Sequence, residues 1–119
     1  MELEQLQSLV LASLEDMKAR DVMVLDVRGK STITDVMIIA SGTSSRHVKS
    51  LADSVAVKAK EAGHKPLGVE GERDSDWVLV DLDQIIVHVM LPTARDFYNL
   101  EKLWGIGSEA RNELRLGAA

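Results

Sequence analysis

The chain has 119 residues, no cysteine and a formal net charge of −5. Its length fits one domain that buries a core without cross-links, and the missing cysteines exclude disulfides and thiolate metal sites. No apolar run approaches the roughly 20 residues of a membrane-spanning helix, and the start MELEQLQSLV lacks the pattern of a signal peptide, so we expect a cytoplasmic protein.

The first elements follow from apolar spacing. Leucines and other apolar residues recur at helical spacing over residues 3–18, which predicts an amphipathic helix. The valine-rich run 21–27 predicts a strand, and a polar connection follows it. Residues 36–40, VMIIA, are apolar at every position, which indicates a central strand covered on both faces.

The next helix has clear start and stop signals. Thr43 or Ser44 supplies a hydroxyl for the N-cap, and Gly63 provides the stop that glycine gives after a helix. Between them, apolar residues fall at the spacing of one helical stripe. Plain capping explains the sequence SGTSSRH (41–47), although its backbone N–H groups also suit an anion.

Three more strands are predicted in the second half, at 66–69, 77–82 and 85–91. The link between the last two, Asp83-Gln84, is short enough for a tight antiparallel hairpin. Helices alternate with strands early and a hairpin follows. The fold class is therefore α/β, with a mixed β-sheet of about five strands and packed helices.

A last helix is expected over residues 93–104, capped by Thr93. Projection at about 100° per residue places an apolar stripe against the sheet. Tyr98 points away from that stripe, on the side of Arg95 and Lys102. We therefore expect Tyr98 to be exposed. Residues 105–119 are expected to form a C-terminal tail that is partly helical or mobile.

Trp77 stands where the chain is most acidic, in GERDSDWVLVDLD (71–83). Side chains alternate along a strand, so Trp77 shares a face with Leu79, whereas Val78 and Val80 look like the core side. The second interpretation from spacing is a tryptophan folded over the core edge. An exposed tryptophan among charges is typical of protein–protein contacts. The acids preceding it are suited to a basic partner: Glu70, Glu72, Asp74 and Asp76.

Catalytic patterns are weak. Asp81-Leu82-Asp83 has the D-x-D form that holds magnesium in nucleotidyltransferases, but it lies far from Gly42 and straddles the expected hairpin turn, where aspartate is common. The histidines His47, His64 and His88 show no ligand spacing. His88 lies in an apolar strand and is interpreted as a satisfied core or interface histidine. We therefore predict no catalytic residues, no metal site and no cofactor.

Three blocks resemble the Iojap-related ribosomal silencing factor family of bacteria and organelles: DVRGKSTITDVMIIASGTSSRHVKSLAD, PLGVEGERDSDWVLVDLDQIIVHVM and FYNLEKLW. The resemblance covers roughly residues 6–104, and the tail from Gly105 lies outside it. It implies a nucleotidyltransferase-like α/β fold that lacks the catalytic acids, as a single domain over residues 1–104. The family commonly has Gly-Asp where this chain has Asp83-Gln84 at the hairpin turn.

The resemblance also implies a function. It implies a translation repressor, not an enzyme, that binds the large ribosomal subunit through its ribosomal protein fourteen and sterically blocks the small subunit. A homodimer is implied for the free protein. The partner-binding surface of the family matches Trp77 and Tyr98 here, with the acids steering encounter and Arg95 and Lys102 tuning orientation. The alternatives are a divergent magnesium-dependent nucleotidyltransferase, using Asp81 and Asp83 with the 42–45 loop, or a generic homodimeric scaffold.

Overall fold

The computed structural model describes residues 1–32, 34–71 and 76–98, the last three of these as backbone only. Within these residues the elements in chain order are α1 (Leu3–Asp16), β1 (Arg20–Asp26), β2 (Val36–Ser41), α2 (Ser45–Glu61), β3 (Gly68–Glu70), β4 (Trp77–Asp81), β5 (Ile85–Met90) and α3 (Pro92–Tyr98). No helix among them is long and apolar enough to cross a membrane.

The described strands form one mixed sheet in the order β1-β2-β5-β4-β3. Only the central pair, β2 and β5, is parallel; the other neighbours are antiparallel. The parallel pair requires a crossover, which α2 and the β3–β4 pair supply. The predicted α/β class with a mixed five-stranded sheet is thus confirmed.

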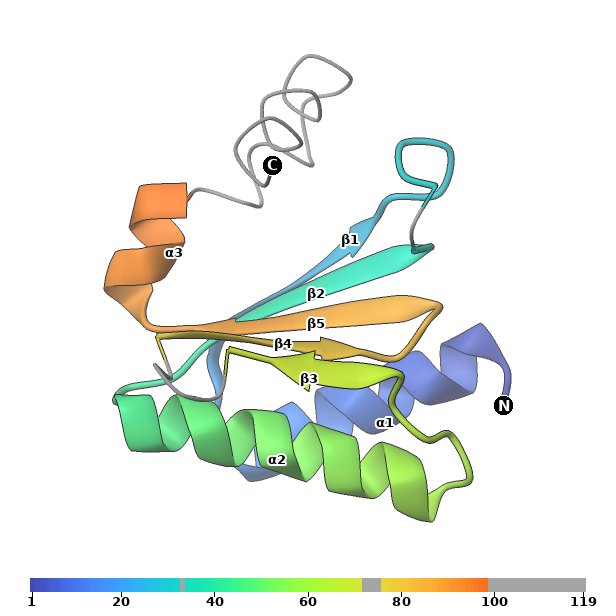
Figure 1. The fold of residues 1–119 in the computed structure, drawn as a ribbon, viewed down its shortest axis with the longest axis horizontal. Coiled ribbons are helices and arrows are strands. Elements are labelled where there is room, and N and C mark those ends of the chain that lie inside the picture. Colours follow the sequence, from blue (N-terminus) through green and yellow to red (C-terminus); the bar gives the residue numbers. More distant parts are fainter. Residues whose placement is uncertain (33, 72–75, 99–119) are drawn as a thin grey trace.

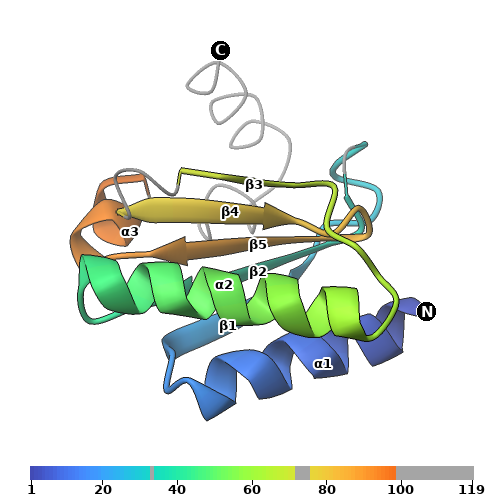
Figure 2. The same ribbon diagram turned by 60° about the horizontal axis from the view of Figure 1, so that its bottom comes forward.

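Both long helices cover the same face of the sheet. Figures 1 and 2 show α1 and α2 side by side beneath it, whereas α3 lies at one end of the opposite face. The main core lies between the long helices and the sheet, and residues such as Leu6, Leu51, Ile38 and Val87 in it are fully buried. We call the opposite side the α3 face.

The α3 face carries a second, smaller core. Val27, Met37, Ile39 and Met90 are buried there, and Leu25, Trp77 and Ala94 pack against them. All six residues of β2 and all six of β5 are buried, so both central strands are covered on both faces. This confirms the prediction for 36–40 and extends it to the whole of β5.

Helix boundaries show one agreement and one error. Ser44 caps α2, since its hydroxyl accepts a hydrogen bond from the N–H of His47 at 3.1 Å. The expectation that Thr93 caps the last helix is wrong. α3 already begins at Pro92, and the carbonyl of Leu91 accepts the first helical bond, from Arg95. Proline suits the first helical position because its fixed φ is helical and its missing N–H would be unpaired there.

Candidate functional site

Trp77 is the first residue of β4 and lies on the α3 face. The burial of β4 alternates as predicted: Val78 and Val80 are buried in the main core, whereas Trp77 and Leu79 are half-buried on the other side. The expectation that Trp77 lies on the less buried face is confirmed. Its ring also packs at the edge of the smaller core, so a large part of the indole has a fixed environment.

The indole of Trp77 is hydrogen-bonded to a buried histidine. Its Nε1–H donates to Nδ1 of His88 at 2.8 Å, and the two ring centroids are 5.7 Å apart. His88 is only 5% exposed, and burial lowers its pKa to about 4. The imidazole is therefore neutral near pH 7, with its proton on Nε2. His88 is thus a buried histidine whose Nδ1 has a hydrogen-bond partner, as predicted.

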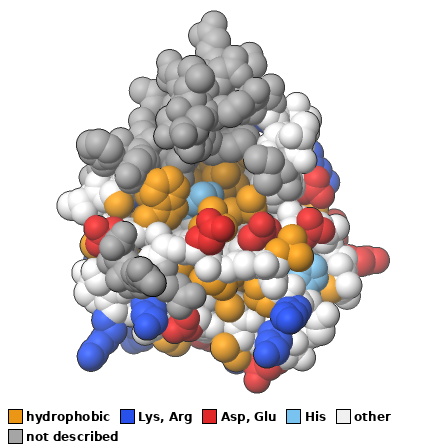
Figure 3. Space-filling model, viewed as in Figure 1, with side chains coloured by type: hydrophobic (Ala, Val, Ile, Leu, Met, Phe, Trp, Pro, Cys, Tyr) orange, Lys and Arg blue, Asp and Glu red, His pale blue; other side chains and the backbone are white. Residues whose placement is uncertain are grey.

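Two predicted acidic residues are close to Trp77, one on the neighbouring strand and one next to it in the sequence. Glu70 ends β3 and pairs with Leu79 of β4, which places it on the α3 face diagonally across from Trp77. Asp76 directly precedes Trp77, and both acids are exposed. In Figure 3, acidic side chains form a row next to hydrophobic side chains and a histidine. We call Glu70, Asp76 and Trp77 the acidic–aromatic surface. Glu72 and Asp74 lie outside the described residues.

Gly71 allows the backbone after β3 to approach the start of β4 closely. Its φ is +90°, and a Cβ added there would collide with the carbonyl oxygen of Trp77. A residue with a side chain would be strained in this conformation and would push β3 away from β4. The glycine therefore permits the close approach of Glu70 and Trp77. No local pattern in the sequence indicates this role, because it depends on the approach of two strands.

Arg95 does not lie where the helical projection puts it. It is only 9% exposed, and its Nη1 donates to the carbonyl of Asp21 at 2.6 Å and to the hydroxyl of Ser41 at 2.9 Å. The expectation of an exposed Arg95 beside Tyr98 is wrong, because the guanidinium anchors α3 to the end of the sheet. The side chain of Tyr98 and all of Lys102 lie outside the described residues.

The D-x-D sequence forms a hairpin turn. The N–H of Leu82 donates to the carbonyl of Ile85 at 2.8 Å, so Asp83 and Gln84 make a tight connection, as predicted. Asp83 has φ +72°, and its N–H donates to Oδ1 of Asp81 at 2.9 Å. Turn chemistry thus accounts for both aspartates. Among residues 1–32, 34–71 and 76–98, no three histidine or acidic side chains are placed to hold a metal ion.

Side chains at the start of α2 accept hydrogen bonds from the backbone N–H groups of the same segment. Nδ1 of His47 accepts the N–H of Thr43 at 2.9 Å, which leaves its Nε2–H to donate to the carbonyl of Met17 at 2.7 Å. With Ser44 as the cap, side chains of this segment already satisfy two of the N–H groups that an anion would need. This geometry favours the capping interpretation of SGTSSRH.

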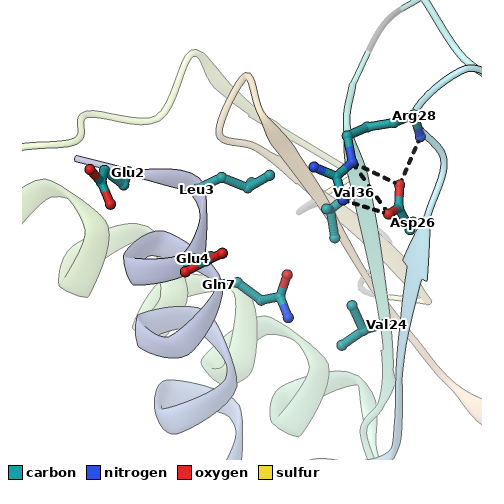
Figure 4. Close-up of a pocket in the computed structure, with 8 residues that line it drawn as sticks. All are labelled: Glu2, Leu3, Glu4, Gln7, Val24, Asp26, Arg28 and Val36. Carbon is teal, nitrogen blue, oxygen red and sulfur yellow. Dashed lines mark hydrogen bonds and ion pairs between the residues drawn. The ribbon is translucent and has the colours of Figure 1, made fainter.

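An open groove of about 540 Å³ lies on the side of the sheet that α1 and α2 cover, between the start of α1 and the edge strand β1 (Figure 4). Asp26 and Arg28 form an ion pair there at 2.7 Å, and the Arg28 guanidinium lowers the pKa of Asp26 to about 2. Arg28 is engaged by Asp26, and Glu2 and Glu4 are the remaining charged residues of the lining. The arrangement offers no nucleophile beside a base.

Comparison with known proteins gives consistent matches. The model of the family described as "Ribosomal silencing factor during starvation" (RsfS) matches residues 1–117. The match therefore continues well beyond residue 104, where the resemblance was expected to end.

Two ribosomal silencing factors named RsfS are close relatives. That of Haemophilus influenzae is 50% identical over 95 residues, 80% of this chain and 93% of the relative. That of Chromobacterium violaceum is 47% identical over 105 residues, 88% of this chain and 86% of the relative. A crystal structure of a Chromobacterium violaceum protein, 47% identical, superimposes with a TM-score of 0.86 over 88% of each chain.

Proposed function

Because the chain belongs to the ribosomal silencing factor family, we propose that it represses translation by binding the large ribosomal subunit through ribosomal protein fourteen. Bound there, it sterically prevents the small subunit from joining. This mechanism requires occupancy of a surface and no catalysis, so the protein acts as a regulator and not as an enzyme. We further propose a nucleotidyltransferase-like domain over residues 1–104, a C-terminal tail, a cytoplasmic location and a homodimer in the free state.

The acidic–aromatic surface is the observation that carries the proposal. A half-buried indole has a fixed position and still offers ring surface to a partner, which is how tryptophan contributes to interface hot spots. Glu70 lies diagonally across from it, Asp76 directly precedes it in the sequence, and both acids are exposed. Negative charge around an aromatic anchor complements a basic protein and speeds encounter with it. The formal charge of −5 acts in the same direction.

The residues of this surface have different roles in the proposal. Trp77 is the anchor, Glu70 and Asp76 steer the basic partner, and Glu72 and Asp74 extend the acidic stretch. Tyr98 and Lys102 complete the contact from the helix side. The buried Arg95 contributes only indirectly, because it holds α3 against Asp21 and Ser41.

Sedimentation of purified ribosomal subunits tests the proposal. Adding the wild-type protein should reduce the peak of joined ribosomes, and the protein should sediment with the large subunit. Trp77→Ala should bind about tenfold more weakly, or worse. The matched control is Val57→Ala, which trims an exposed residue on α2, on the opposite side of the sheet. Normal subunit joining at saturating wild-type protein would refute the mechanism.

Charge-reversal variants and the dependence of binding on salt test the proposed role of the acids independently. Glu70→Lys should weaken binding, and binding of the wild type should weaken as ionic strength rises, because exposed charges are screened. Asp53→Lys makes the same charge change at an exposed position on α2 and should have little effect. Equal losses in both variants would mean that net charge, and not this surface, governs binding.

A further inference from the structure

His88 lies directly behind the proposed anchor, on the neighbouring strand. The hairpin register pairs Trp77 with Met90 and Leu79 with His88, so the two rings meet diagonally on the α3 face. They are tilted by 43°, and the 2.8 Å bond joins the indole N–H to Nδ1. His88 occupies a central strand that is buried along its whole length, whereas Trp77 begins a strand next to the edge of the sheet.

We infer that His88 is a positioning residue for partner binding, because it fixes the orientation of the Trp77 indole before the partner arrives. This inference rests on the proposed function of Trp77 as an anchor. A tryptophan at the start of a strand has several rotamers, and freezing it at an interface has an entropic cost. The bond to a buried, immobile acceptor selects one rotamer in the free protein, so less freedom is lost on binding.

The protonation state of His88 is suited to this role. Only the neutral ring has a free lone pair on Nδ1, and burial favours the neutral ring by lowering the pKa of His88. Among the residues that the structure describes, charged groups on the same face include Glu70 of β3, Asp81 of β4, Arg95 of α3 and, by its pairing with Ser41, Arg20 of β1. Arg95 donates to Ser41, which pairs with Met90 two residues from His88. The acceptor is thus available throughout the physiological range.

A shape-matched pair of substitutions isolates the hydrogen bond. Asparagine and leucine both branch at Cγ and have the same number of heavy atoms, but only asparagine keeps an acceptor near the position of Nδ1. His88→Leu should lower the affinity for the large subunit about fivefold or more, whereas His88→Asn should stay within about twofold of the wild type. Equal losses in the two variants would overturn the inference, and so would full affinity in both.

Exchange of the indole proton reports the bond without any partner. In the free protein labelled with ¹⁵N-tryptophan, Trp104→Phe identifies the remaining indole signal as that of Trp77. Its N–H should exchange slowly with solvent in the wild type and in His88→Asn, and at least tenfold faster in His88→Leu. An unchanged exchange rate in His88→Leu would show that the bond does not hold the ring.

A double-mutant cycle with Trp77→Phe completes the test, because phenylalanine keeps an aromatic ring and removes the donor. His88→Leu should have no further effect on affinity in the Trp77→Phe background; a second, additive loss would overturn the inference. If the wild type does not bind the large subunit, the proposed function fails and the inference fails with it. If the wild type binds and His88→Leu binds equally well, only the inference fails.

Discussion

Replacing Gly71 by alanine should destabilise the protein by more than the backbone conformation alone requires. Gly71 follows β3, with φ +90°, and the added methyl group would collide with the carbonyl oxygen of Trp77. Two effects therefore combine at one position. The first is the strain of a left-handed conformation in a residue with a side chain, and the second is a clash with backbone that cannot rotate away.

Gly63 separates these two effects. Its φ is +87°, almost the same as that of Gly71, but a Cβ built there meets no atom within 4 Å beyond Gly63 itself and its two chain neighbours. Gly63→Ala should therefore lower the free energy of unfolding by the strain alone, about 1–2 kcal/mol. Gly71→Ala adds the displacement of β3 from β4, about 1–3 kcal/mol by analogy with overpacked cores. The difference between the variants measures the steric effect.

Urea unfolding followed by circular dichroism provides the measurement, with the wild type and both variants under the same conditions. We expect the free energy of unfolding to fall in the order wild type, Gly63→Ala, Gly71→Ala. The affinity of Gly71→Ala for the large subunit should fall as well, because Glu70 moves relative to Trp77. Equal stability of the two variants would refute the claim that Gly71 is required for close approach of the strands.

Three further effects should be measurable by the same unfolding assay. Ser44→Ala should cost about 1 kcal/mol through loss of the α2 cap, and Ser45→Ala, one residue later, should cost less. The pKa of His88 is about 4 in the folded state, below its ordinary value of 6.5. Stability should therefore be full above pH 6.5 and fall by about 3 kcal/mol as the pH drops from 6.5 to 4, and His88→Leu should lack this component. Arg95→Met should lower the free energy of unfolding by about 2 kcal/mol, because two hydrogen bonds of a buried guanidinium are lost. Arg28→Met removes an exposed ion pair and should change stability much less. Similar losses in the two variants would contradict the anchoring role of Arg95.

Most elements could be predicted from the sequence, because their signals are local. The stripe of α2 and its flanking Ser44 and Gly63 determine one helix, and uninterrupted apolar residues mark β2 as central. The Asp83-Gln84 turn even determines the register of its hairpin, in which Trp77 faces Met90 and Leu79 faces His88. The nearness of His88 to Trp77 could have been deduced from that register.

The missed features depend on contacts between distant segments. A helical projection places Arg95 on an exposed side because it considers one helix alone. Its partners, Asp21 and Ser41, come from the first half of the chain. The role of Gly71 depends on how closely two strands approach. The parallel pairing of β2 with β5 also joins segments far apart in sequence, and no local pattern specifies that order.

That central pairing has a consequence for the protein while it is being synthesised. β2 needs β5 on its inner edge, and the register joins Val36 to Ile85, so the sheet cannot close until residue 90 has left the ribosome. Until then, the nascent chain holds α1, α2 and a β1–β2 pair whose apolar inner edge has no partner strand. Pairing β2 with β5 closes the long segment between them, which is slow. Meanwhile the exposed edge of β2 is able to pair with strands of other chains. The last strand of the sheet therefore sets how long the newborn protein remains vulnerable to aggregation.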